Sequence, residues 1–224
     1  HYSTRAEVAN ELANLEKIRG DKMMALGNAS LEEIEKNPAL LALARARGKT
    51  VFGDNCAPCH GSGVAGAKGY PNLNDDEWLW GGTLDQIMQT VQFGARSGHA
   101  KAHEGAMLAF GKEGVLKKEQ IVTVANYVRS LSGLSTSQGY DAAAGAKIFA
   151  DNCAACHGDA GKGNQEVGAP DLTDKIWLYG SDEATLIETI SNGRAGVMPA
   201  WVGRLDPSTI KALTVYVHSL GGGK

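Results

Sequence analysis

The sequence has little of what marks several large classes of protein. No run of 18 or more apolar residues occurs in the 224 residues, so the sequence contains no candidate transmembrane helix. The formal net charge of -3 lacks the basic excess that nucleic-acid binding requires, so no nucleic-acid partner is expected. Alternating runs of β-branched residues are scarce, which argues against a β fold. With 43% hydrophobic and 21% charged residues, the chain has the composition of an ordinary globular protein.

Cysteine is scarce too, but its placement is informative. All four cysteines fall in two copies of one pattern, CAPCH at residues 56–60 and CAACH at residues 153–157. Two thiols at this spacing can form thioethers with the two vinyl groups of one porphyrin, and the histidine that follows lies close enough to bind the iron. The pattern therefore predicts two covalently bound haem c groups. Their attachment residues are Cys56 and Cys59 with His60 as iron ligand, and Cys153 and Cys156 with His157 as iron ligand.

A thioredoxin-like redox pair, a zinc site and a pair of short disulfides are the alternatives for these cysteines. A redox pair needs no adjacent histidine and does not ordinarily occur twice. A zinc site would accept the four cysteines and leave both histidines unexplained. We therefore favour the haem interpretation.

The two motifs lie inside an internal repeat. Residues 48–61 match residues 145–158, and residues 71–82 match residues 170–181. A period of about 95 residues is too long for a solenoid and fits the duplication of a whole small domain. We therefore expect two domains. The predicted boundaries are an N-terminal extension over 1–37, a first domain over 38–133, a linker over 134–140 and a second domain over 141–224.

Local signals predict helices in both copies. Asn37 before Pro38 marks a helix start, and Thr83 opens a capping box for a short helix that ends near Gly94. The last helix of each copy carries one apolar stripe, which faces a core. The stripes are Ile121, Val124, Val128 and Leu131 in the first copy, and Ile210, Leu213, Val217 and Leu220 in the second. The expected fold class is all-α, with two tandem class I cytochrome c-like domains after an N-terminal helical extension.

The sixth iron ligand separates electron carriers from catalysts, because methionine closes the coordination site and raises the potential. Met198 lies in a loop bounded by glycine and proline, and Met107 stands at the matching place in the first copy. We expect both to bind iron. His99 and His103 lie in the loop before Met107 and are the competing ligands there.

Two further pairs of residues recur in the repeat. The carbonyl region of Pro71 and of Pro170 is expected to accept the hydrogen bond that orients the proximal imidazole, with a simple rigid turn as the alternative. Arg96 and Arg194 each follow a helix-ending glycine, where a guanidinium could bind a haem propionate. Ordinary solvation of these arginines is the alternative.

The chain closely resembles the dihaem subunit of cbb3-type cytochrome c oxidases, known as CcoP or FixP. The resemblance rests on the tandem CxxCH motifs, on YSTRAEV at residues 2–8, on PNLNDDEWLWGGT at residues 71–83 and on GLSTSQGY at residues 133–140, and it covers nearly the whole chain. In that family the dihaem part projects into the periplasm from an N-terminal membrane anchor and passes electrons toward the subunit that reduces oxygen.

The resemblance implies partners and a location. The partners are the haem–copper catalytic subunit, a monohaem cytochrome subunit and a soluble cytochrome c donor, on the periplasmic face of the bacterial inner membrane. Because the chain opens on His1, we expect that an anchor preceded it. No catalytic site is expected in the chain, although the assembly is an oxygen-reducing, proton-pumping enzyme.

Some questions stay open at this point. In a lone cytochrome domain Met107 would close the haem of His60, and Met198 that of His157; the resemblance suggests instead that the two methionines are exchanged. The rival functions are a free dihaem carrier of the cytochrome c4 type and a dihaem peroxidase. The extension over residues 1–37 counts against the first, and two matching methionines count against the second.

Overall fold

The computed structural model describes residues 4–222 and contains ten helices in that range, with isolated β-bridges and no strand. This confirms the predicted all-α fold class. Within the described range, no helix has the length and apolar character needed to cross a membrane. Residues 1–3 of the predicted extension and 223–224 of the predicted second domain lie outside that range. The helices are α1 (Thr4–Asn28), α2 (Leu31–Lys36), α3 (Pro38–Asn55), α4 (Ala57–His60), α5 (Leu84–Phe93), α6 (Lys118–Leu131), α7 (Ala142–Asn152), α8 (Ala154–His157), α9 (Glu183–Asn192) and α10 (Pro207–His218).

Helix ends follow the local signals of the sequence. The side chain of Asn37 accepts hydrogen bonds from the first N–H groups of α3, which begins at Pro38. Thr83 and Gln86 form the predicted capping box at the start of α5. The same helix ends at Gly94, whose φ of 71° is a conformation that favours glycine.

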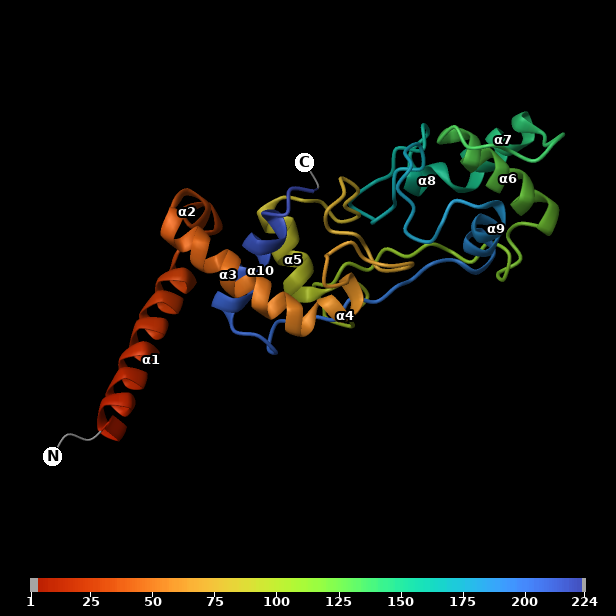
Figure 1. Ribbon diagram of the computed structural model, residues 1–224. Helices are drawn as coiled ribbons and strands as arrows, with labels where there is room; N and C mark the ends of the chain where they lie inside the picture. The colour runs from red at the N-terminus through yellow and green to blue at the C-terminus, as the bar shows by residue number, and fades with distance from the viewer. Residues whose placement is uncertain (1–3, 223–224) are drawn as a thin grey trace.

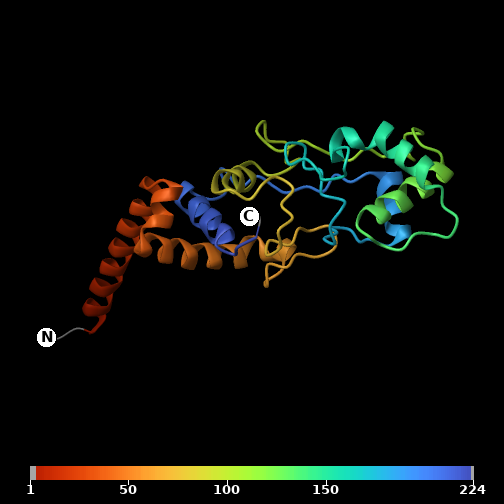
Figure 2. The ribbon, with the colours of Figure 1, turned by 90° about the horizontal axis from the view of Figure 1, so that it is seen from above.

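The helices that pack together come from different copies of the repeat. The last helix of the second copy, α10, packs on α3 and α5 of the first copy. The last helix of the first copy, α6, packs on α7 and α9 of the second copy. Figures 1 and 2 both show α6 among α7, α8 and α9, and α10 beside α3 and α5. We call α3–α5 with α10 the first lobe, and α6–α9 the second lobe; α1 and α2 belong to the N-terminal extension.

A glycine in each lobe permits a close helix crossing. A Cβ atom added to Gly48 of α3 would lie 2.3 Å from the carbonyl oxygen of Ala212 in α10. A Cβ atom added to Gly145 of α7 would lie 2.8 Å from Cβ of Tyr127 in α6. The same crossing is therefore built twice, each time between helices of different copies.

Each lobe has its own apolar core, drawn from both copies. The first-lobe core comprises Val51, Phe52, Val64, Ile87, Val91, Ile210, Leu213 and Val217. The second-lobe core comprises Phe110, Leu116, Ile121, Val124, Ala125, Val128, Phe149, Leu172, Leu186 and Ile190. The predicted stripes of the last helices face these cores, as expected.

The N-terminal extension packs on the first lobe. Leu26, Leu31 and Ile34 are buried against Ala44 of α3 and residues of α10. Lys211 of α10 donates hydrogen bonds to the carbonyl oxygens of Gly27 and Ala29, where α1 ends. The rest of α1 projects away from both lobes as an arm (Figure 1).

Two extended segments carry the chain between the lobes. Residues 94–117 run from the first lobe to the second, and residues 193–206 run back (Figure 2). The N–H of Lys112 donates to the carbonyl of Ser191 in the second lobe at 2.9 Å, and the N–H of Trp201 donates to the carbonyl of Gln92 in the first lobe at 3.1 Å. We call these the outward segment and the return segment.

Candidate haem sites

The two CxxCH motifs have nearly the same backbone geometry. The first cysteine of each ends one helix and starts a four-residue helix, with φ and ψ of -108° and -34° at Cys56 and -114° and -35° at Cys153. In both, the helix that precedes the motif points directly at the first cysteine. The repeat predicted from the sequence is therefore also a repeat in structure at the attachment sites.

The histidine of each CxxCH motif is held by the proline carbonyl that the sequence suggested. Nδ1 of His60 lies 2.9 Å from the carbonyl oxygen of Pro71, and Nδ1 of His157 lies 3.1 Å from that of Pro170. When Nδ1 carries the proton and donates it here, Nε2 keeps the lone pair that binds a metal. Burial lowers the pKa of His157, although the bond to Pro170 opposes this, and so favours the neutral imidazole that can ligate iron.

No disulfide joins the cysteines of the two motifs. All four lie within the described residues, and none is paired with another. Burial, together with the charge of the second thiol of each pair, raises the pKa of Cys56 and of Cys153 to about 11. A raised pKa does not favour the reactive thiolate of a thioredoxin-like redox pair.

The surroundings of the motifs fit a haem. The buried ring of Phe52 lies 6.3 Å from that of His60, centroid to centroid, and Phe149 is the matching buried ring in the second lobe. Within residues 4–222, Nε1 of Trp177 is buried without a hydrogen-bond partner. A haem would suit these surroundings, because the rings near each histidine are apolar and a propionate would offer an acceptor to that indole N–H.

Each methionine candidate lies in the lobe that holds the other copy's CxxCH motif. Met198 forms two backbone hydrogen bonds with Ala95, at 2.9 and 3.0 Å. Ala95 lies at the start of the outward segment, just after α5 ends. Met107 forms the equivalent pair with Arg194, at 2.9 and 3.2 Å. Met107 also packs on the second-lobe core, as do Cys153 and Trp177. Met107 therefore lies in the second lobe with Cys153, and Met198 lies beside Ala95 of the first lobe.

The competing histidines are engaged elsewhere. The ring of His103 stacks on Trp80 at 4.3 Å between centroids, and its Nε2 lies 3.0 Å from Oγ1 of Thr90. The ring of His99 stacks on Phe93, and its Nδ1 accepts the N–H of Lys101 at 3.1 Å. Burial, with the nearby charge of Arg96, lowers the pKa of His103. The stacking partners of both rings, Trp80 and Phe93, lie in the first lobe outside the loop that carries the histidines.

The repeated arginines bind protein groups. Arg96 donates to backbone carbonyls in both segments that carry the methionines. Arg194 donates to Thr189 and Glu188 of its own lobe and lies over the ring of Tyr179 at 4.2 Å. This difference was not predicted from the sequence. The available signal was the longer stretch between arginine and methionine in the first copy, residues 97–106 against 195–197.

Carboxyl groups from the two lobes lie close together where the lobes meet, and this cluster was also not predicted. Oxygens of Glu77 from the first lobe and of Asp171 and Asp174 from the second lie within 4.8 Å of one another. Burial, then the hydrogen bond with Asp174 and the charges of both aspartates, raises the pKa of Glu77 to about 7. A crevice of about 200 Å³ adjoins Glu77 and Asp171.

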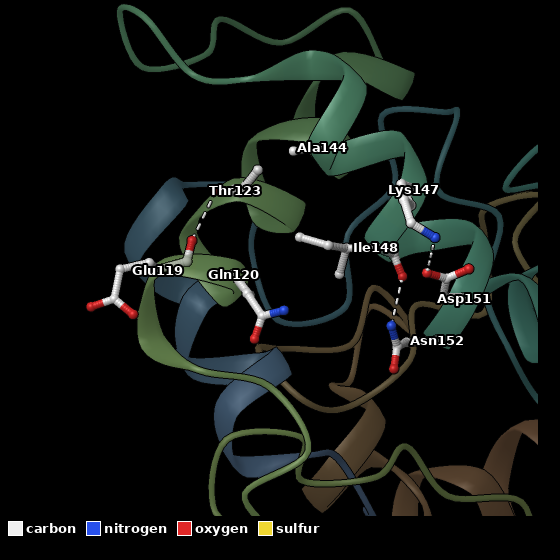
Figure 3. A pocket seen from close by; sticks show the side chains of 8 residues that line it. All are labelled: Glu119, Gln120, Thr123, Ala144, Lys147, Ile148, Asp151 and Asn152. Carbon is white, nitrogen blue, oxygen red and sulfur yellow. Dashed lines mark hydrogen bonds and ion pairs between the residues drawn. The ribbon is translucent and has the colours of Figure 1, made fainter.

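A second hollow lies between α6 and α7, away from the predicted ligands. Its volume is about 400 Å³, and its lining includes Glu119 and Thr123 of α6 and Ile148 of α7 (Figure 3). Lys147 and Asp151 form an ion pair at its edge with a distance of 2.9 Å. None of the predicted haem ligands or attachment cysteines lines this pocket. It is a groove between two helices that come from different copies.

Comparisons with known proteins agree with this architecture. The family profile described as "Cytochrome c" matches residues 45–132, and the profile described as "Cytochrome C oxidase, cbb3-type, subunit III" matches residues 140–217. The cbb3-type cytochrome c oxidase subunit FixP of Bradyrhizobium diazoefficiens is 84% identical over 223 residues, which cover 100% of this chain and 77% of that protein. This chain belongs to the FixP/CcoP family.

Similarity extends across the family. FixP of Azorhizobium caulinodans is 60% identical over all of this chain and 75% of its own length. CcoP of Cereibacter sphaeroides is 48% identical over all of this chain and 77% of its own length. The resemblance seen in the sequence is therefore confirmed. The two cytochrome c-type domains of this FixP/CcoP chain imply covalent binding of haem c.

Proposed function

We propose that this chain carries two haem c groups and, as a subunit of a cbb3-type oxidase, relays electrons from a soluble cytochrome c to the haem–copper catalytic subunit. The observation that carries the proposal is the repeated set of ligands. Each CxxCH motif has a histidine held by a proline carbonyl, and each lobe contains one segment that carries a methionine. Two matched sites of this kind suit one-electron transfer.

Haem iron, when bound, alternates between ferric and ferrous states and so carries one electron. The chain's own residues set how readily it does so. The bonds to Pro71 and Pro170 hold each imidazole in one orientation and raise its basicity. Met107 and Met198, as the proposed sixth ligands, favour the reduced iron and close the position that peroxide would need. This supports a carrier over a peroxidase.

The proposed pairing is exchanged, with Met198 for the haem of His60 and Met107 for the haem of His157. Backbone pairing of Met198 with Ala95 and of Met107 with Arg194 supports it. Exchange ties the lobes together at two points and keeps the haems close, which favours rapid transfer between them. We also propose the domain boundaries given above for the two copies in sequence, each completed by the last helix of the other.

The proposed setting is the periplasmic face of the bacterial inner membrane, next to the haem–copper subunit and a monohaem cytochrome subunit. Support comes from the relatives, which are named as subunits of cbb3-type oxidases. The α1 arm supports it too, since exposed apolar residues such as Leu12, Leu15 and Ile18 lie along a helix that contacts neither lobe over most of its length. A free carrier of the cytochrome c4 type has no use for such an arm.

The test uses the full-length protein purified with its membrane complex. We expect two haem c per chain, rapid reduction by a soluble cytochrome c, and reoxidation by oxygen only when the haem–copper subunit is present. A chain that never co-purifies with a copper-containing membrane complex would support the free carrier instead. A high-spin ferric haem with rapid peroxide turnover would support the peroxidase.

A further inference from the structure

Arg96 stands where the two segments that carry the methionines pass each other. It follows Ala95, the residue that pairs with Met198, and it begins the part of the outward segment that leads to Met107. Its side chain is half-buried at this crossing. One residue thus lies next to both segments that carry the proposed methionine ligands, although these ligands are assigned to different haems.

The guanidinium of Arg96 binds both segments. Nε donates to the carbonyl oxygen of Gly196 at 2.6 Å, two residues before Met198 in the return segment. Nη1 donates to the carbonyl oxygen of Gly105, two residues before Met107 in the outward segment. A charged donor makes stronger hydrogen bonds than a neutral one, and the rigid fork fixes the two carbonyls relative to each other.

The rest of the loop holds this guanidinium in place. The N–H of Arg96 donates to the carbonyl of His103 at 2.7 Å, which folds the loop back on itself, and φ of Arg96 is 51°. A positive φ is uncommon for a residue with a Cβ atom and persists only when the surroundings determine it. The guanidinium also lies 5.9 Å from the ring of Trp80, which stacks on His103.

Trp80 connects this loop to the second lobe. A Cβ atom added to Gly168 would lie 2.3 Å from the indole ring, and one added to Gly105 would lie 2.0 Å from the carbonyl oxygen of Val167. Both approaches need glycine. The groups that pack around Arg96 therefore come from both lobes.

Arg194, the matching residue of the second copy, has no such role. Its backbone pairs with Met107 as that of Ala95 pairs with Met198, but its guanidinium donates to Thr189 and Glu188, in the last turns of α9. Its aromatic neighbour Tyr179 matches Trp80 in the repeat. The repeat has therefore kept an arginine over an aromatic ring at both crossings, while only Arg96 reaches both methionine segments.

The geometry points to Arg96 as a positioning residue that holds both methionine segments at once and so makes the sixth ligation of the two haems interdependent. The inference rests on the proposed function, because it needs Met107 and Met198 as iron ligands. Loss of the Arg96 fork frees Gly105 and Gly196 together, so both sulfurs lose their fixed approach to iron. Loss of the Arg194 guanidinium frees neither carbonyl.

The test is Arg96→Leu in the haem-loaded full chain, which keeps apolar bulk and removes every donor. The readout is the long-wavelength charge-transfer band that ferric haem shows with a methionine sulfur ligand, recorded for each haem in Cys153→Ala/Cys156→Ala and Cys56→Ala/Cys59→Ala backgrounds. We expect the band to weaken at both haems, with faster amide exchange at Met107 and Met198. Unchanged bands at either haem would overturn the inference.

Companion variants separate this role from a general effect on folding. Arg96→Lys should recover part of both bands, since an ammonium can bind two carbonyls as Lys211 does at Gly27 and Ala29. Arg194→Leu should leave the first-lobe haem unchanged, and Arg204→Leu, an exposed arginine beside Trp201, should leave both unchanged.

Further outcomes are equally decisive. If Arg96→Leu does not accumulate, Arg96→Gln replaces it, because its shorter amide cannot bridge Gly105 and Gly196; wild-type bands in that variant would overturn the inference. Bands missing from the unaltered chain would contradict the proposed function itself. Bands present there and kept in the Arg96 variants would contradict only the inference.

Discussion

The two lobes hold their CxxCH motifs alike but differ in the N-terminal helices and in the loop that leads to the methionine segment. The histidine–proline distances are 2.9 and 3.1 Å, and the backbone angles at Cys56 and Cys153 agree within 6°. The first lobe alone carries the N-terminal helices and the long loop that contains Arg96. Duplication has therefore preserved the attachment of the cofactor, whereas the parts that have diverged join the lobes to each other and to the extension.

Exchange of the last helices explains why divergence is confined in this way. Each lobe needs α3 or α7 from one copy and α10 or α6 from the other, so neither copy can complete a core alone. The helix faces that meet must stay compatible, as the glycines at both crossings show. The loops and the extension lie outside this constraint.

The largest predicted effect is that of Gly48→Ala. Its new Cβ would lie 2.3 Å from the Ala212 carbonyl and 2.4 Å from Cβ of Tyr216, so α10 must move away from α3. Overpacking of this kind costs about 1–3 kcal/mol. We expect the free energy of unfolding of the first lobe to fall by that amount, as measured by denaturant titration followed at its haem.

Two matched glycines serve as controls. Gly53→Ala in the same helix meets open space and should stabilise it by up to about 1 kcal/mol through helix propensity. Gly145→Ala meets Tyr127 at 2.8 Å, a milder clash in the second lobe, and should cost less than Gly48→Ala. If Gly48→Ala behaved like Gly53→Ala, α10 would not pack on α3, and the exchange of the last helices between the copies would be wrong.

A smaller effect is expected where the extension meets the first lobe. Lys211→Met removes the two hydrogen bonds, each 2.6 Å long, that an ammonium makes with the end of α1. A hydrogen bond to a charged group contributes about 1.5–3 kcal/mol, and partial exposure of Lys211 places the expected loss of stability at the low end of this range. We expect faster amide exchange and proteolysis around residues 25–31, with the second lobe unchanged.

Lys147→Met is the control for that measurement. Lys147 pairs with Asp151 on the surface of α7, an exposed pair of the kind that contributes little. Equal protection of residues 25–31 in both variants would show that Lys211 does not secure the extension.

The smallest effect concerns the carboxyls between the lobes and depends on pH. The folded pKa of Glu77, about 7, lies above its ordinary value of 4.5, so the folded chain binds this proton more tightly than the unfolded chain does. Stability from this group is then present below pH 4.5 and is lost as the pH rises through 7. Glu77→Gln should raise the Tm at pH 8, and the gain should shrink toward pH 5.

Asp76→Asn provides the comparison, since this neighbour is exposed. The Tm difference between Asp76→Asn and the unaltered chain should not increase from pH 5 to pH 8. A Glu77→Gln variant with the same Tm difference at both pH values would mean that the pKa of Glu77 is not raised in the folded chain.

Much of the fold could be predicted because its signals are local. Helix starts at Asn37 and Thr83 depend on a cap and its next few residues. The apolar stripes of α6 and α10 depend on helical spacing, and the histidine–proline bonds on residues that recur in both copies. Family membership followed from the motifs and is confirmed by the relatives.

The sequence could not decide which partner each stripe meets. Both last helices offer an apolar stripe and both first helices offer a glycine, so own and exchanged pairing look the same in sequence. The contacts of Arg96 and the raised pKa of Glu77 arise between segments that lie far apart in the sequence. Those contacts depend on tertiary packing, which no local pattern encodes.

The most direct test of the exchanged pairing uses a chain with one haem. In the Cys153→Ala/Cys156→Ala background, only the haem of Cys56 and Cys59 remains, and its midpoint potential can be titrated alone. We predict that Met198→His lowers this potential markedly, because histidine replaces methionine at the iron, and that Met107→His leaves it unchanged. If Met107→His lowered this midpoint potential instead, the exchanged pairing of the methionines with the haems would be contradicted.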